Sequence, residues 1–125
     1  MADLSGTWLG TYWQEGEPTR FEATLVQTGN VLSGNILDDN YLGEATISGQ
    51  VIGRRVSFTK RYLIKNQGSI DYTGTVSEDE NFMQGEWAIR DIASGPWEAS
   101  RSDENLMADL QKRLVQELAV AGGKK

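Results

Sequence analysis

Lys60 is the residue of this sequence best suited to binding chemistry. It follows Val56 and Phe58 and precedes Tyr62 at strict alternation, so in a strand these side chains share one face. A lysine among apolar side chains needs a partner, because a buried ammonium group is costly without one. Either Lys60 lies at a mouth of the fold and reaches water along its own stem, or it meets an acidic group such as Asp91 or the carboxylate of a ligand.

Further polar and aromatic side chains are predicted on the same inward face. An interior cation with nearby tyrosine hydroxyls is suited to orienting one polar or anionic end of an otherwise apolar molecule. The aromatic members of the set are equally consistent with an ordinary core. The predicted ligand-binding lining consists of Tyr12, Phe58, Lys60, Tyr62, Tyr72, Trp87 and Asp91.

The composition leaves little for catalysis or metal binding. The chain has no cysteine and no histidine, which removes disulfides, thiol nucleophiles, the usual zinc ligands and the Ser/His and Cys/His pairings. The carboxylates of Asp38-Asp39 and of 78–80 fall in predicted turns, where a solvated loop is favoured over a calcium site. General acid–base chemistry by Lys60, a tyrosine and Asp91 is conceivable, but nothing requires it. We therefore expect a protein that is not an enzyme and uses no cofactor and no metal.

The charge balance narrows the classes of partner. The net charge is −6 at pH 7, the wrong sign for a protein that binds phosphate backbones or anionic lipid. No apolar stretch approaches the length of a membrane span. The first twenty residues contain no basic and apolar leader, which predicts a cytoplasmic protein, although a mature secreted form cloned behind Met1-Ala2 would read the same.

Alternation of apolar with polar residues predicts a mainly β fold, and the short Gly-, Asn- and Asp-rich separators allow only antiparallel neighbours. We expect a single domain over residues 1–125, with an eight-stranded up-and-down β-barrel over 4–101. Its outward positions are polar, as in a barrel that stands in water. The predicted strands are roughly Gly6 to Trp13, Arg20 to Gln27, Val31 to Leu37, Gly43 to Val51, Arg55 to Leu63, Ser69 to Val76, Phe82 to Arg90 and Pro96 to Arg101, with Ala93-Ser94-Gly95 read as a turn.

Five of the predicted strands carry a glycine two residues from a large apolar group on either side, so the glycines face inward. A mid-strand glycine costs stability, and its recurrence indicates a shared geometric need. Two explanations stay open. Either the glycines allow tight coiling and are covered by neighbouring aromatics, or they leave room for a small ligand. The glycines are Gly10, Gly34, Gly49, Gly74 and Gly85.

The spacing of apolar residues changes at residue 102, from alternate positions to every third or fourth position. Leucines spaced by four predict an amphipathic helix over 102–121, followed by a flexible tail at 122–125. The apolar stripe of this helix either packs on its own barrel or pairs with a second subunit, which would make a homo-oligomer.

The segment Gly6-Thr7-Trp8 resembles the Gly-x-Trp opening of the calycin superfamily, which includes lipocalins, fatty-acid-binding proteins and avidins. Lipocalins place an arginine late in the last strand, over this tryptophan, and Arg101 matches that position. The resemblance implies an up-and-down barrel closed at one end by Trp8 and Arg101. A cation over an indole face has a structural rationale of its own.

Two functions from different classes follow as expectations. The first is a non-enzymatic, lipocalin-like barrel that holds a small, partly apolar ligand in its interior, oriented by Lys60 and the tyrosines. The second is a protein-interaction or assembly module with a filled core, which uses the C-terminal helix and the outer barrel surface. The sequence does not identify the ligand.

Overall fold

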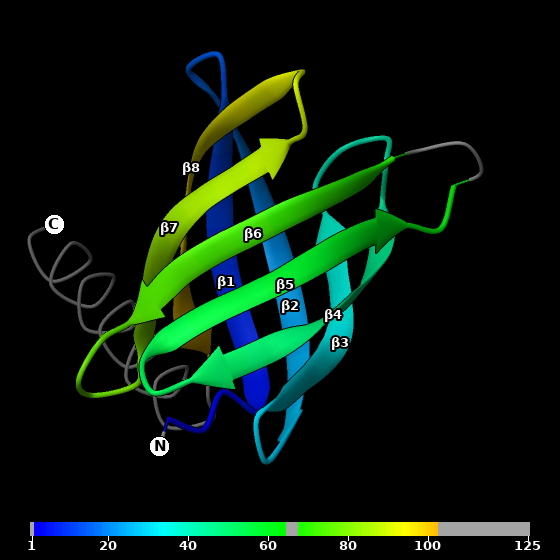
Figure 1. The fold of residues 1–125 in the computed structure, drawn as a ribbon. Coiled ribbons are helices and arrows are strands. Elements are labelled where there is room, and N and C mark those ends of the chain that lie inside the picture. Colours follow the sequence, from blue (N-terminus) through cyan, green and yellow to red (C-terminus); the bar gives the residue numbers. More distant parts are fainter. Residues whose placement is uncertain (1, 65–67, 103–125) are drawn as a thin grey trace, which may run out of the picture.

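The computed structural model describes residues 2–64 and 68–102. It is an all-antiparallel closed barrel in which each strand pairs with the next and β8 returns to β1, where Trp8 lies opposite Arg101 (Figure 1). The predicted meander barrel is therefore confirmed. The helix predicted from residue 102, and the tail after it, lie outside the described residues except for Ser102, which ends β8. The strands are β1 (Gly6–Gln14), β2 (Glu17–Thr28), β3 (Val31–Asp38), β4 (Glu44–Ile52), β5 (Arg55–Tyr62), β6 (Ser69–Val76), β7 (Phe82–Ile89) and β8 (Ala93–Ser102).

Two strands begin earlier than predicted. β2 begins at Glu17 because Glu15 and Gly16, with φ of 51° and 82°, form a two-residue hairpin turn that pairs Gln14 with Glu17. The prediction of a turn at residues 93–95 is wrong, since Ala93 pairs with Ile89 and Gly95 with Trp87 in the β7–β8 ladder. Small residues next to a glycine resembled a turn, but here the glycine lets the strand pass close to the Trp87 ring.

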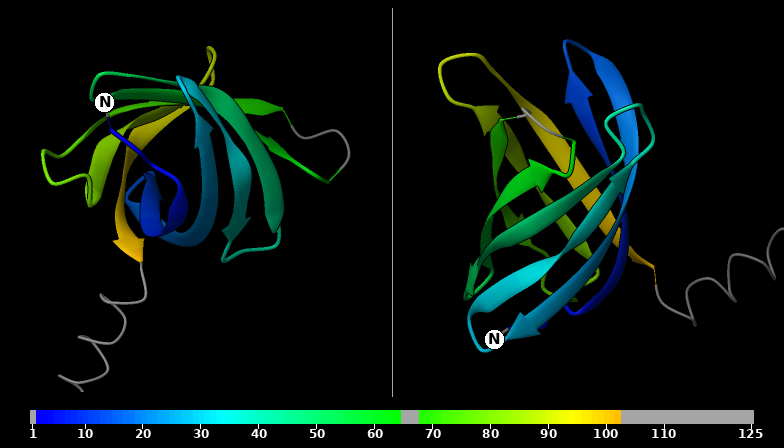
Figure 2. Two further views of the ribbon diagram at one scale, coloured as in Figure 1. Left: turned by 90° about the horizontal axis from the view of Figure 1, so that it is seen from below. Right: turned by 90° about the vertical axis from the view of Figure 1, so that its right-hand side faces the viewer.

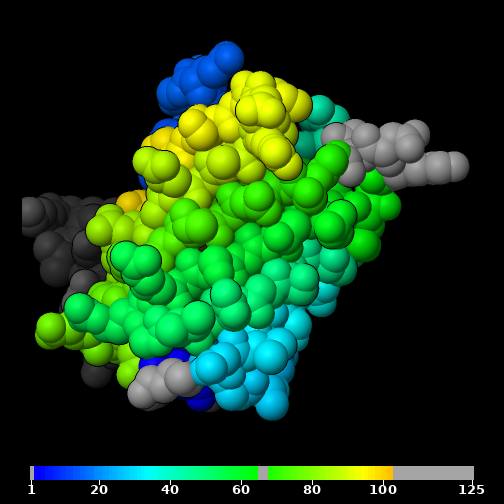
Figure 3. All heavy atoms as spheres, viewed as in Figure 1, coloured from blue at the N-terminus to red at the C-terminus, as the bar shows by residue number. Residues whose placement is uncertain are grey.

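Strand alternation assigns one face of each strand to the core and the other to the surface. The outward positions predicted to be polar are exposed or half-buried, and Figure 3 shows the outer face of β5, β6 and β7 covered by side chains. The inward side chains form one buried cluster that includes Leu25, Ile36, Val56 and Trp97. In its middle, Phe58 stacks on Tyr72 with ring centroids 4.8 Å apart. No helix long and apolar enough to cross a membrane occurs among the described residues.

The inward glycines are explained by the approach of neighbouring strands. A Cβ on Gly85 would overlap the carbonyl oxygen of Thr73, and one on Gly49 would overlap that of Ser57. A Cβ on Gly74 would also lie 2.9 Å from the Trp97 ring. These positions favour the explanation by tight coiling under aromatic cover, because a side chain there would strike backbone or an aromatic ring and not empty space.

Replacement of Gly85 with alanine is expected to lower the free energy of unfolding by about 1–3 kcal/mol, because β6 must move away to admit the methyl group. Gly68→Ala is the matched control, since no atom lies within 4 Å of the added Cβ. Urea denaturation of both variants measures the difference. Equal stabilities would contradict the strand-approach explanation.

One end of the barrel, the closed end, is covered by residues 2–5, which lie across it in the left view of Figure 2. Leu4 is fully buried there and accepts a 2.9 Å hydrogen bond from the Trp8 indole. The Arg101 guanidinium lies 4.6 Å from the Trp8 ring centroid and donates to the carbonyls of Asp3 and Ser5. Trp8 and Arg101, the two residues predicted to close one end of the barrel, therefore lie in contact with each other at this end.

Candidate functional site

The centre of the candidate site is a buried ion pair between β5 and the end of β3. Lys60 Nζ lies 2.8 Å from both carboxylate oxygens of Asp38, and the two side chains are fully buried. Of the two environments predicted for Lys60, the structure therefore has the one with an acidic partner. The partner is Asp38 and not Asp91.

Asp38 was predicted to lie in a solvated turn, and that prediction is wrong. It is the last residue of β3, paired with Phe21 of β2, and alternation from the buried Ile36 turns its side chain inward. Of the two adjacent aspartates, Asp38 is buried and Asp39 is exposed. The parity of Ile36 and Asp38 could have identified this inward position, but the run of acidic and amide residues at 38–40 resembled a turn.

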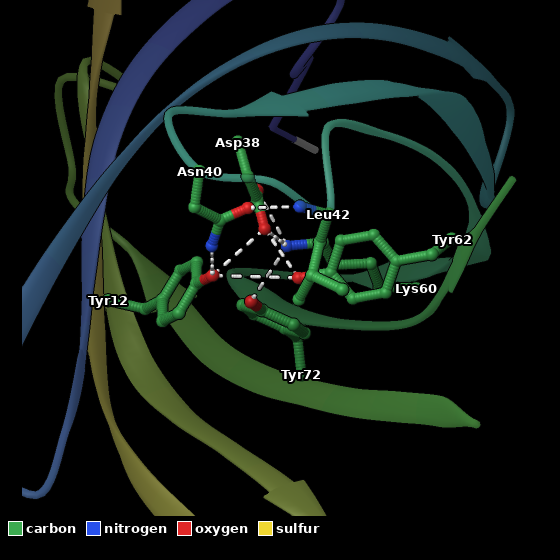
Figure 4. Close-up of polar contacts among 7 residues, drawn as sticks. All are labelled: Tyr12, Asp38, Asn40, Leu42, Lys60, Tyr62 and Tyr72. Carbon is green, nitrogen blue, oxygen red and sulfur yellow. Dashed lines mark hydrogen bonds and ion pairs between the residues drawn. The ribbon is translucent and has the colours of Figure 1, made fainter. Parts of the chain in front are cut away.

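Tyrosine hydroxyls surround the ion pair (Figure 4). The Tyr12 hydroxyl donates to Asp38 Oδ2 over 2.9 Å, and Tyr62 donates to the same oxygen in a shorter hydrogen bond. Tyr72 contacts the lysine instead, and its hydroxyl accepts a hydrogen bond from Lys60 Nζ at 3.5 Å. Lys60 Nζ also lies 4.8 Å from the ring centroids of both Tyr12 and Tyr62. We call Asp38, Lys60 and these three tyrosines the polar cluster.

The polar cluster lies toward the end of the barrel opposite residues 2–5. This loop end carries the turn at 15–16, the loop at 39–43, Leu63 and Ile64 after β5, and the turn at 90–92. Asn40 reaches over the cluster from the exposed loop and donates to the Tyr12 hydroxyl at 3.1 Å. The Leu42 backbone N–H donates to Asn40 Oδ1 at 2.9 Å and holds that side chain in position.

Burial shifts the ionisation of the cluster. It lowers the pKa of the Lys60 ammonium, and the adjacent carboxylate of Asp38 opposes this effect. Burial also raises the pKa of the Tyr72 phenol, with a further contribution from the negative charge of Asp38. The pKa of Tyr62 is raised by burial and by its hydrogen bond to Asp38. The tyrosines therefore stay protonated in the folded protein at pH values where they ionise in the unfolded chain.

This difference predicts a loss of stability at alkaline pH. Tyr72 retains its proton above its ordinary pKa of 10.0 in the folded state only, so its contribution is present below pH 10 and is lost as the pH rises further. The slope is about 1.4 kcal/mol per pH unit for each such tyrosine. Urea denaturation between pH 9 and 11 should give a shallower decline of the free energy of unfolding for Tyr72→Phe than for the unmodified protein, with the two slopes differing by about one proton, or about 1.4 kcal/mol per pH unit, only as the pH approaches 11. Parallel declines would contradict the prediction.

The other predicted lining residues lie apart from the ion pair. Asp91 is exposed in the β7–β8 turn with φ of 60°, so its predicted inward position is wrong. The β7 ladder ends at Ile89, and the alternation used to place Asp91 does not continue into the turn. Phe58 and Trp87 are buried in the core, where the Trp87 indole donates to the Trp13 carbonyl over 3.0 Å.

The loop end also exposes apolar side chains, which the sequence prediction missed. Tyr41 is 87% exposed, Ile92 79%, Leu63 61% and Ile64 43%. They come from separate connections of the barrel, so only the three-dimensional arrangement brings them to the same end. We call these four residues the loop rim.

The geometry of the cluster suits hydrogen bonding and charge stabilisation more than metal ligation. Among the described residues, no group of three or more acidic side chains is placed to hold a metal ion. Every buried polar side-chain atom in the described ranges has a hydrogen-bond partner. A comparison with known protein families and one with curated proteins found no match to this chain.

Proposed function

We propose that this protein binds a small, partly apolar molecule at the loop end of its barrel, with the polar group of the ligand directed toward the polar cluster. The observation that carries the proposal is the buried Lys60–Asp38 pair under Asn40 and Tyr62. A fully buried ion pair is weak evidence for a contribution to stability, because desolvation offsets much of the attraction. Because the pair lies beneath the loops, we assign it a role in recognising the polar group of the ligand.

The surroundings of the pair fit such a ligand. Tyr62 is half-buried and Asn40 exposed, so these two side chains lie between the buried ion pair and solvent. The apolar loop rim offers contact area to the remainder of the molecule, as binding sites combine apolar walls with few polar groups. The inward side chains pack against one another in the middle of the barrel. The proposed ligand therefore binds at the loop end and not deep in the interior.

The calycin-like features add support. The opening Gly6-Thr7-Trp8 and the contact of Arg101 with Trp8 belong to the closed end, which leaves the loop end for binding. Membership of the calycin superfamily, and of its lipocalin-like ligand binders in particular, is part of this proposal.

Binding of a neutral apolar dye such as Nile red tests the proposal. We expect the fluorescence titration to saturate, and Tyr41→Ser to weaken binding roughly fivefold because an exposed aromatic contact is lost. Val31→Ser is the matched control, since Val31 is 63% exposed but lies at the closed end. Native mass spectrometry of the purified protein adds a search for a bound compound. The absence of saturable dye binding and of any bound compound would contradict the proposal.

A second candidate function is a protein-interaction or assembly module. The filled middle of the barrel and the exposed loop rim favour it, because large apolar side chains exposed at one end of a fold can form a contact surface. The predicted C-terminal stripe would contribute to self-association. Sedimentation of the full chain with Leu110→Ser and Leu114→Ser tests this form: an unchanged mass in solution counts against it.

A further inference from the structure

The polar cluster is electrically balanced without a ligand. The ammonium of Lys60 contacts both oxygens of Asp38 at 2.8 Å, so each charge has its counter-charge inside the fold. The described side chains that hydrogen-bond to the pair are those of Tyr12, Tyr62 and Tyr72, which are uncharged as phenols. A charged ligand group that reached the pair would find no further opposite charge among them.

The hydrogen bonds of the ion pair are also largely used. Lys60 directs its three N–H groups at Asp38 Oδ1, Asp38 Oδ2 and the Tyr72 hydroxyl. Asp38 Oδ2 accepts from Lys60, Tyr12 and Tyr62. Two less buried groups keep hydrogen-bonding capacity for a ligand. The hydroxyl of the half-buried Tyr62 donates to Asp38 and can still accept, and the amide of the exposed Asn40 contains both a donor and an acceptor.

From this arrangement we propose that the ligand carries an uncharged hydrogen-bonding group, such as a hydroxyl or an amide, and that the site discriminates against carboxylates and amines. The inference rests on the proposed function and names its ligand class. A carboxylate would approach the buried negative charge of Asp38, and an ammonium group the buried positive charge of Lys60. Each would lose hydration without gaining a free counter-charge. A hydroxyl can donate to Tyr62 and accept from Asn40 without such a cost.

Three probes with the same alkyl chain test the inference: 1-octanol, octanoate and octylammonium at pH 7.5. We expect 1-octanol to bind at least about tenfold more tightly than either ion in calorimetric titrations of the full chain. Equal or tighter binding of either ion would overturn the inference and leave the proposed function standing. If none of the three binds, and Nile red does not bind either, the proposed function fails as well.

Asp38→Asn gives a sharper form of the same test. The substitution keeps the shape and one acceptor oxygen of the side chain but leaves the Lys60 cation without its counter-ion. Octanoate should then bind at least about tenfold more tightly than it does to the unmodified protein, while octylammonium stays weak. Unchanged octanoate binding by a folded variant would overturn the inference.

A second variant keeps the test decisive if Asp38→Asn does not fold, as judged by circular dichroism. Tyr62→Phe retains the ion pair and removes only the hydroxyl that donates to Asp38 Oδ2 and that we propose accepts from the ligand. It should weaken 1-octanol binding about fivefold and leave the weak binding of octanoate unchanged. Unaltered 1-octanol binding would count against recognition of the ligand by this hydroxyl and overturn the inference.

Discussion

Replacement of Lys60 with methionine is expected to lower the free energy of unfolding by about 3–5 kcal/mol. Methionine fills a similar volume, so packing changes little. The loss arises because Asp38, which is 3% exposed, remains buried without the ammonium that lies 2.8 Å from both of its oxygens. Urea denaturation at pH 7 measures the effect.

The double variant Lys60→Met with Asp38→Leu provides the control. It removes both charges together, so it should be more stable than Lys60→Met alone, because no buried charge is left unpaired. The double variant should still be less stable than the unmodified protein, since Tyr12 and Tyr62 no longer have the carboxylate to which they donate. A single variant Lys60→Met within about 1 kcal/mol of the unmodified protein would contradict the assignment of a buried pair.

Arg101→Ala is expected to lower the free energy of unfolding by about 3–4 kcal/mol and to release residues 2–5 from the closed end. Arg101 donates to the carbonyls of Asp3 and Ser5 at 2.7 and 2.8 Å, and to that of Glu80 from both Nε and Nη2. Its loss also removes the cation over the Trp8 ring. Urea denaturation measures the stability, and hydrogen exchange at Leu4 measures the release.

Arg101→Lys is the matched control for charge. A lysine keeps a cation near Trp8 but lacks the planar fork that reaches several carbonyls at once. Arg101→Lys should therefore retain less than half of the free energy of unfolding that Arg101→Ala loses. Full recovery by lysine would show that charge alone, and not the hydrogen-bond pattern of the guanidinium, secures the closed end.

The strand pattern was predictable from sequence because each strand buries one face, so that apolar and polar residues alternate along it. Val56, Phe58 and Lys60 illustrate this in β5, where all three are buried. The errors lie at the ends of strands. Gly95 and Ser94 have the composition of a turn, yet they pair in the β7–β8 ladder, because a glycine is also required where a strand passes close to an aromatic ring.

The candidate site was only partly predictable for a related reason. Alternation placed Lys60, Tyr12 and Tyr72 inward, as observed, but it could not identify the partner of Lys60. Asp38 belongs to a strand 22 residues away in the chain, and its pairing depends on how the barrel closes. The exposed Tyr41 and Ile92 carry no periodic signal at all, since loops have none, and only the closed barrel brings them to one end.

The central claim is that ligands bind at the loop end, over the polar cluster. A titration of isotope-labelled protein with 1-octanol, followed by amide chemical shifts in NMR spectra, tests it most directly. The account predicts saturable shifts concentrated at residues 38–43, 62–64 and 90–92. Shifts concentrated instead around Trp8 and Arg101, or around Gln50, Thr73 and Gln84, which line a hollow of about 960 Å³ on the outer wall, would contradict it.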